Sequence, residues 1–201
     1  MTIDQLLATA TLHSQDPVQH PTLTIPGDWS QGRTSYGGIS AAMVYAAMQA
    51  QVTDDRLLRA FNCNFVGPLN VDEPFKIDVE VLRQGKSASQ VLARAIQNDQ
   101  VVVLCQASFG VARKSKIKVE NKLEHGMPLP KKPKFIPHIP KVTPKFIKQF
   151  ELALVEGKLP FMGSKTSHLH GWMRYKQTPE SFQDAHLIGL IDAWPPTVLQ
   201  M

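Results

Sequence analysis

The chain has 201 residues and a mass of 22.4 kDa, enough for one large domain or two small ones. Hydrophobic residues make up 43% and charged residues 19%, a composition that excludes collagen-like, coiled-coil and low-complexity proteins. The longest apolar runs are far shorter than the roughly 20 residues that cross a bilayer, and the first residues lack a basic signal region. We therefore expect a cytoplasmic protein without membrane insertion, in which Cys63 and Cys105 are reduced, buried thiols.

The net charge of +5 comes from one segment, residues 113–145, and the rest of the chain is net negative. The segment holds six prolines, two acidic residues and ten basic residues: Arg113, Lys114, Lys116, Lys118, Lys122, Lys131, Lys132, Lys134, Lys141 and Lys145. Prolines keep a chain extended and exclude a regular helix, so we expect a solvated linker. A patch for an acidic ligand such as a nucleotide phosphate is the alternative. No nucleic-acid-binding motif accompanies the charge, and we expect no nucleic-acid partner.

The first elements in chain order are a short helix, a short strand, a turn-rich segment and a long helix. They are expected at Ile3–Ala10, Thr22–Ile25, Gly27–Gly38 and Ile39–Val52. The last of these is almost wholly apolar and contains neither Pro nor Gly. This pattern predicts a helix that is buried on most of its sides.

Four strand-like runs follow, at Arg59–Val66, Phe75–Leu82, Ser87–Gln97 and Val101–Ala112. Apolar and polar residues alternate in the first two runs, as one half-buried face of a sheet requires. The connections between the last three runs are short enough for hairpins. The pattern predicts an antiparallel sheet folded around the long helix, in the α+β class, although a generic α+β sandwich would satisfy the same pattern.

Two further extended segments are expected after the linker, at Phe150–Gly157 and His170–Arg174, before the run Leu190-Ile191-Asp192-Ala193-Trp194-Pro195-Pro196. Together with the helix and four strands of the first half, this run resembles the double hot-dog acyl-CoA thioesterases, relatives of the bacterial type II enzymes. The resemblance implies an antiparallel sheet wrapped around a central helix in each half. It also implies acyl-CoA as substrate, a homo-oligomer, and Asp192 as the catalytic aspartate.

The resemblance also suggests how the chain is divided. We expect a first hot-dog domain at residues 1–112, the basic Pro-rich linker at 113–145, and the start of a second hot-dog domain at 146–201. A second hot dog requires strands after its central helix, and the sequence stops at Met201 directly after that helix. We therefore expect the second unit to be truncated. The Thr or Asn and the Gln that help to position water in the family would lie in the absent part.

Asp192 is also a candidate on physical grounds. It lies near the end of a predicted helix that Pro195 prevents from continuing, where the helix dipole disfavours a negative charge. Apolar neighbours should desolvate the carboxyl, and both effects raise its pKa toward that of a general base. The alternative is that Asp192 only accepts hydrogen bonds from the turn before the two prolines.

Gly37, Gly38 and Trp194 are the candidate substrate-binding residues. The glycines could let backbone N–H groups approach a carbonyl or phosphate oxygen, or could only form the tight turn into the helix. Trp194 could line a pocket or belong to the core, and Met43 and Met48 leave the same two possibilities open. The segment from Gly37 to Gln51 contains no acidic residue, so the first half supplies no helix-borne base.

The histidines offer weaker candidates. His168 and His170 would share one face of a strand and could hold a metal, but no third ligand with suitable spacing is evident. We therefore expect a solvated strand face, no metal and no cofactor. His186 is poorly spaced from Asp192 for a catalytic dyad on a straight helix.

The resemblance, together with the position of Asp192, favours an acyl-CoA thioesterase of fatty acid metabolism that hydrolyses fatty acyl-CoA with water activated by Asp192. A thioester is reactive enough that no nucleophilic Ser or Cys is needed. Two alternatives remain at this stage. One is a non-catalytic module that binds acyl thioesters or lipids, and the other is a structural hot-dog protein that pairs with another subunit through an exposed edge.

Overall fold

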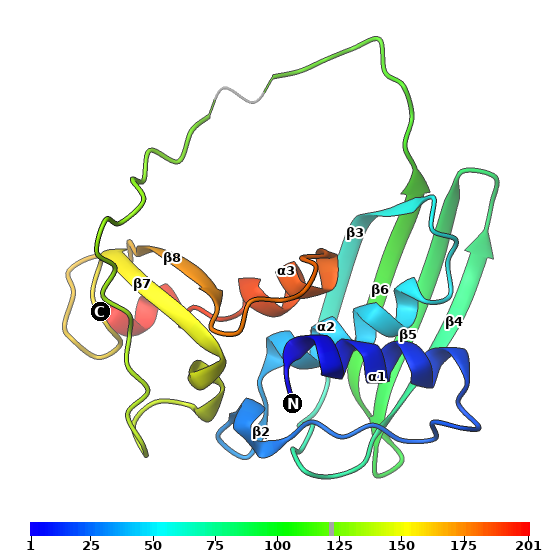
Figure 1. Ribbon diagram of the computed structural model, residues 1–201, viewed down its shortest axis with the longest axis horizontal. Coiled ribbons are helices and arrows are strands. Elements are labelled where there is room, and N and C mark those ends of the chain that lie inside the picture. Colours follow the sequence, from blue (N-terminus) through cyan, green and yellow to red (C-terminus); the bar gives the residue numbers. More distant parts are fainter. Residues whose placement is uncertain (121–122) are drawn as a thin grey trace.

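The structure is a computed structural model that describes residues 1–120 and 123–201. Its largest sheet is antiparallel and has four strands (Figure 1). Its strands are β3 (Arg56–Phe65), β4 (Lys76–Gln84), β5 (Ala88–Gln97) and β6 (Gln100–Val111), in the order β3-β6-β5-β4. The two residues between β5 and β6, Asn98 and Asp99, both have positive φ. A two-residue hairpin requires this backbone conformation. All four predicted strands are confirmed, with ends that differ by a few residues.

Two helices cover one face of this sheet, α1 (Ile3–Gln15) and α2 (Gly37–Gln49). A capping box of Thr2 and Gln5 begins α1, which continues beyond the predicted end at Ala10. The long buried helix is confirmed, but it begins earlier than predicted. Gly37 and Gly38 form its first turn, whereas the sequence analysis placed them before it.

The predicted strand Thr22–Ile25 is wrong. Leu23 makes an isolated bridge with Phe75, and the flanking segment has no further ladder. Pro21 and Pro26 bracket this stretch and cannot donate ladder hydrogen bonds, which limits the pairing to a single bridge. The chain then forms a one-turn helix, η1 (Gly27–Trp29), and the two-residue strands β1 (Ser30–Gln31) and β2 (Thr34–Ser35).

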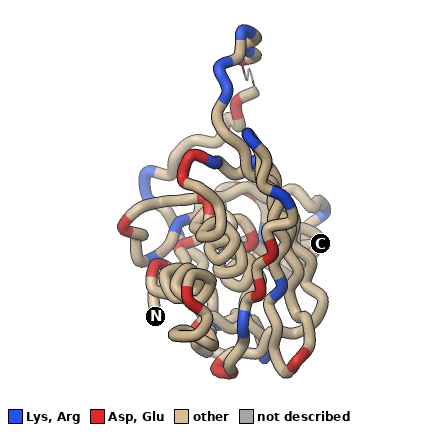
Figure 2. The backbone as a smooth tube through the Cα atoms, turned by 90° about the vertical axis from the view of Figure 1, so that its right-hand side faces the viewer, with Lys and Arg blue, Asp and Glu red and all other residues tan. Residues whose placement is uncertain are grey.

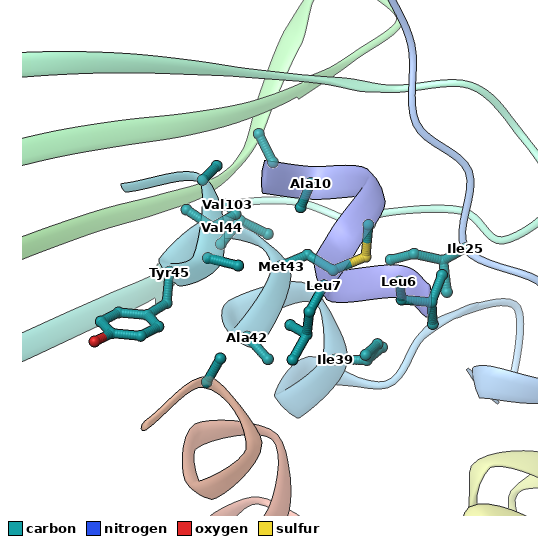
Figure 3. Close-up of a cluster of buried hydrophobic side chains, with 14 of the residues drawn as sticks. Leu6, Leu7, Ala10, Ile25, Ile39, Ala42, Met43, Val44, Tyr45 and Val103 are labelled. Atoms are coloured by element: carbon teal, nitrogen blue, oxygen red, sulfur yellow. The ribbon is translucent and has the colours of Figure 1, made fainter. Parts of the chain in front are cut away.

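The core lies between α1, α2 and the sheet. Figure 3 shows Leu6 and Leu7 of α1 beside Met43 of α2, and all three are buried. On the opposite side of α2 the ring of Tyr45 packs edge-on against Phe61 of β3, with 5.7 Å between the ring centroids. Met43 and Met48 are both fully buried among these residues, which assigns them to core packing.

The second half adds a smaller sheet and a helix. The one-turn helix η2 (Lys145–Gln149) leads into β7 (Phe150–Glu156), which pairs with β8 (His170–Tyr175) before α3 (Asp184–Ile191) and η3 (Thr197–Gln200). Both predicted extended segments are confirmed. In Figure 1, α3 lies between the two sheets, and its closest helical neighbour is α2. Stacking of Tyr36 on Phe146, with centroids 4.1 Å apart, joins the halves as well.

The basic segment between β6 and η2 contains no helix within its described residues, as its prolines predict. Figure 2 marks Lys and Arg positions in blue on the backbone tube, and several of them lie along the part of the chain that projects from the body. Lys122, which belongs to the predicted linker, lies outside the described residues. Phe135 bridges to Ala153 of β7, so the end of the segment follows the second sheet. The predicted boundaries at residues 112 and 145 stay predictions. Among the described helices, none is long and apolar enough to span a membrane.

Candidate functional site

Asp192 is the residue that ends α3. It occupies the C-cap position, with the Ala193 N–H donating to the Leu190 carbonyl at 3.0 Å, and Pro195 follows three residues later. This confirms the predicted position of the carboxylate at the carboxyl end of a helix. Asp192 is partly shielded by its surroundings but remains exposed enough for solvent to reach its side chain.

The Asp192 carboxylate lies at the first turn of α2. It accepts a hydrogen bond from the backbone N–H of Gly38. A Cβ atom built on Gly37 would lie 2.8 Å from Asp192 Oδ2 and 2.9 Å from Cζ of Phe65. The first N–H groups of a helix have no partner within the helix, so they are free to bind an acceptor from elsewhere. Three residues that the sequence analysis named, Gly37, Gly38 and Asp192, therefore meet at one point.

Two opposing effects act on the acidity of Asp192. Burial against its surroundings is the larger effect and raises the pKa of the carboxyl above its usual value, while the Gly38 N–H lowers it. The predicted direction of the pKa shift is confirmed. The aromatic ring of Phe65, at the end of β3, is the apolar neighbour across the site, and sequence reasoning did not identify it.

Tyrosine hydroxyls hold α3 in place against the start of α2 and against β8. Tyr36, the N-cap residue of α2, donates its hydroxyl to the Gly189 carbonyl at 2.8 Å, and Tyr175 of β8 donates to the His186 carbonyl at 2.8 Å. A Cβ on Gly189 would lie 2.6 Å from the Tyr175 hydroxyl, so only glycine permits this close approach. Sequence reasoning missed Tyr36, whose one signal is its place directly before Gly37.

The two cysteines lie opposite each other on β3 and β6, and both are free thiols. A hydrogen bond from Cys105 lowers the pKa of Cys63, against the opposing effects of burial and of the nearby Asp192 charge. The same bond, with burial, raises the pKa of Cys105. Cys105 is buried as predicted, whereas Cys63 is half-buried and lies close enough to Asp192 for that charge to raise the pKa of its thiol.

Trp194 and His186 take other positions. The indole of Trp194 lies over Gly171 of β8, where a Cβ would be 2.4 Å from the ring, so its role in substrate binding stays a prediction. His186 is buried, and its Nε2 lies 2.9 Å from Asp4 Oδ1 of α1. This pairing agrees with the expectation that His186 does not form a dyad with Asp192.

His168 and His170 have a third neighbour that the sequence spacing did not reveal. Glu156, at the end of β7, is the register partner of His170, and one metal-ligating atom from each of the three residues lies within 4.8 Å of the others. Spacing along the chain does not reveal this third ligand, because strand pairing brings Glu156 to the two histidines.

Two surface hollows, of about 510 and 470 Å³, lie along α1, and Asp192 lines neither. The first is lined by His13 and by residues of β4, and the second by residues around His186. Asp192 instead lies outside both hollows, at the α2–α3 junction.

Comparison with known structures supports the hot-dog fold. A hot-dog-fold protein of Alicyclobacillus acidocaldarius superimposes with a TM-score of 0.74 at 21% identity, over 89% of this chain and 66% of that one. A putative thioesterase II of Thermobifida fusca gives 0.70 at 15% identity, over 89% of this chain and 68% of that one. An acyl-CoA thioesterase II of Mycobacterium marinum gives 0.59 at 19%, over 76% and 56%. The shared fold is an α+β hot dog.

Sequence comparison identifies the family. Acyl-CoA thioesterase 2 of Haemophilus influenzae is 32% identical over 82 residues, which are 41% of this chain and 29% of that protein. This chain thus matches less than a third of the curated relative's length. The family model for the acyl-CoA thioesterase N-terminal domain matches residues 25–110, and the model for the acyl-CoA thioesterase C-terminal domain matches residues 125–201. Because the two domains match in order over most of its length, the chain belongs to the acyl-CoA thioesterase family.

Proposed function

We propose that this chain hydrolyses acyl-CoA to the free acid and CoA at the junction of α2 and α3, with Asp192 as the general base. The observation that carries the proposal is the meeting of the Asp192 carboxylate with the N-terminal turn of α2 at Gly38. Hydrolysis of a thioester by water is assisted by a proton acceptor for the water and by a group that stabilises the developing oxyanion, and the positive end of a helix can serve as the second.

The proposed reaction has two steps. Asp192 takes a proton from a water molecule as the water oxygen bonds to the thioester carbonyl carbon, whose π electrons move onto the carbonyl oxygen. The positive end of α2 stabilises the oxyanion that forms. The intermediate then collapses, the carbon–sulfur bond breaks, and the CoA thiolate leaves with the proton that Asp192 held. The raised pKa of Asp192 makes its carboxylate a stronger base than an ordinary aspartate.

A fatty acyl chain is the proposed substrate class. Phe65 lies beside the carboxylate and Ile191 precedes it, and both side chains are more than half exposed to solvent. Contact with an acyl chain would remove this apolar surface from water, at about 25 cal/mol per Å². An apolar substrate would also exclude water from the carboxylate and strengthen its basicity.

The proposal places the protein in the cytoplasm, in fatty acid metabolism, as a homo-oligomer. Two thiols that face each other across β3 and β6 and remain free suit a reducing compartment.

Exposed apolar side chains on α3, such as Leu187, offer surface for association between chains. Light scattering over a range of protein concentrations measures that association directly.

The test is release of CoA from a panel of short-chain to long-chain acyl-CoA thioesters, followed by the absorbance of the thioester bond. Asp192→Asn retains the shape of the side chain and removes the proton acceptor, so turnover should fall by about 10²-fold or more. Asp54→Asn, at an exposed aspartate away from the junction, is the matched control and should behave as wild type. Equal turnover in Asp192→Asn and wild type would contradict the proposed base.

A second variant distinguishes this mechanism from covalent catalysis. Cys63 lies near Asp192, and its hydrogen bond with Cys105 lowers the pKa of its thiol, so it is a nearby thiol that could compete as a nucleophile. We expect Cys63→Ala to retain turnover, and intact-protein mass spectrometry to show no acyl adduct on wild type. Saturable acyl-CoA binding without turnover by the folded wild type would instead indicate a non-catalytic binding module.

A further inference from the structure

Glu156, His168 and His170 form a cluster on the second sheet, apart from the α2–α3 junction. Glu156 is the last residue of β7, His170 is the first residue of β8, and His168 precedes it in the connection. The rings of the two histidines are in edge contact, with centroids 4.1 Å apart. Two imidazoles and one carboxylate are a ligand set typical of zinc sites that keep a fourth position for water.

The distances within the cluster fit a metal ion better than direct hydrogen bonds. His168 Nε2 and His170 Nδ1 lie 3.4 and 3.6 Å from Glu156 Oε2. A charge-assisted N–H···O bond would measure about 2.7–2.9 Å. In a tetrahedral zinc site with metal–ligand bonds of about 2.0–2.1 Å, neighbouring ligand atoms are about 3.4 Å apart. Both observed separations are close to that value.

The backbone that carries the ligands is held in place by a buried side chain. Gln200 of η3 is 1% exposed and donates its side-chain N–H to the His168 carbonyl at 2.8 Å. Its side-chain oxygen accepts from the Lys158 N–H at 2.7 Å, two residues after Glu156. One amide thus fixes both ends of the β7–β8 connection, so the ligands are positioned before any ion binds.

We propose that Glu156, His168 and His170 bind one divalent transition-metal ion of the zinc class, with solvent as the fourth ligand. The three side chains are 62%, 51% and 42% exposed, which gives an ion access from solvent and leaves room for a water ligand. The ion joins the two ends of the connection at residues 157–169 and so restrains that loop. This role is structural and independent of the proposed hydrolysis at Asp192.

Binding of ZnCl2 to the untagged chain, measured by isothermal titration calorimetry, tests the site. We expect one tightly bound ion per chain. Because each ligand supplies a third of the protein's coordination, His170→Ala and the isosteric Glu156→Gln should each weaken binding at least tenfold. His138→Ala removes a histidine outside the cluster and should bind as wild type. Absence of saturable binding, or equal affinity in His170→Ala and wild type, would overturn the proposal.

A second measurement reports the restraint on the loop. The connection contains Lys158 and Lys165, both sites for trypsin. Zinc should slow cleavage at these residues several-fold in wild type and in His138→Ala, because the bound ion lowers the population of the open loop. In His170→Ala the rate should be the same with and without zinc. Zinc binding that leaves the rate of tryptic cleavage unchanged in wild type would contradict the proposed restraint on the loop.

Discussion

The phenolic hydroxyl of Tyr36 donates a 2.8 Å hydrogen bond to the main-chain carbonyl of Gly189, a residue 153 positions later in the sequence. This carbonyl belongs to the last turn of α3, where Ala193 N–H bonds to Leu190, so Tyr36 supplies a donor where the helix does not. The tyrosine that begins α2 thereby holds the end of α3 three residues before Asp192. Burial raises the pKa of Tyr36, which keeps its hydroxyl protonated and able to donate.

Replacing Tyr36 by Phe should reduce both stability and turnover. The buried Gly189 carbonyl loses its donor, at a cost of about 1–3 kcal/mol in the free energy of unfolding, while the stacking on Phe146 is retained. Turnover falls further because Asp192 is no longer held in register with Gly38. Urea denaturation and the acyl-CoA assay measure the two effects.

Tyr175→Phe is the matched comparison. It removes the same kind of bond, from a buried tyrosine to the His186 carbonyl, but at the opposite end of α3 from Asp192. Stability should fall by a similar amount while turnover per folded molecule changes less than in Tyr36→Phe. Equal losses of turnover in the two variants would show that Tyr36 acts on stability alone.

Gly37→Ala should impair turnover by about 10²-fold without unfolding the protein. The added Cβ would lie 2.8 Å from Asp192 Oδ2, so the carboxylate must move away from the N-terminus of α2. The residue is in the first turn of a helix, where alanine is favourable. Circular dichroism should therefore remain unchanged. The control is Gly67→Ala, whose Cβ meets its nearest atom at 3.7 Å.

The sequence predicts the fold better than it predicts the site. Alternation in β3 and β4 and the apolar stretch in α2 specify sheet and helix because each is a local pattern with its own period. The strand predicted at Thr22–Ile25 is wrong because the prolines on either side limit its pairing to one bridge, although its residues are apolar enough for a strand. The first turn of α2 was placed too late because glycine disfavours helix interiors but is tolerated at an N-terminus.

Only part of the candidate site could be found in this way. Asp192 could be singled out because it lies at the end of a predicted helix before two prolines. The family resemblance of the run from Leu190 to Pro196 pointed to the same residue. Its partner Gly38 and neighbour Phe65 belong to the first half, and no local pattern encodes contacts across more than a hundred residues. Glu156 was missed for the same reason, since its proximity to His170 arises from the pairing of β7 with β8.

The 2.9 Å contact of His186 Nε2 with Asp4 Oδ1 should stabilise the packing of α1 against α3. Asp4→Asn weakens an interaction with a buried imidazole, so we expect a loss of about 1–3 kcal/mol in the free energy of unfolding. A double-mutant cycle with His186→Gln isolates the coupling. A coupling energy within error of zero would show that the pair does not join the helices energetically.

Asp192→Asn should raise the stability of the protein while it lowers its activity, and the gain in stability should occur only above acidic pH. Burial raises the folded-state pKa of Asp192 above its unfolded value, so the protonated form suits the folded protein better. The stability contribution of this group is complete below the unfolded pKa and is lost as pH rises through the folded pKa. Asn carries no charge at any pH, and Asp192→Asn should therefore have a higher Tm than wild type at neutral pH. The difference should vanish at acidic pH, where wild-type turnover also declines because Asp192 becomes protonated. A lower Tm of Asp192→Asn at neutral pH would show that the bond from Gly38 to the carboxylate outweighs the cost of burying it.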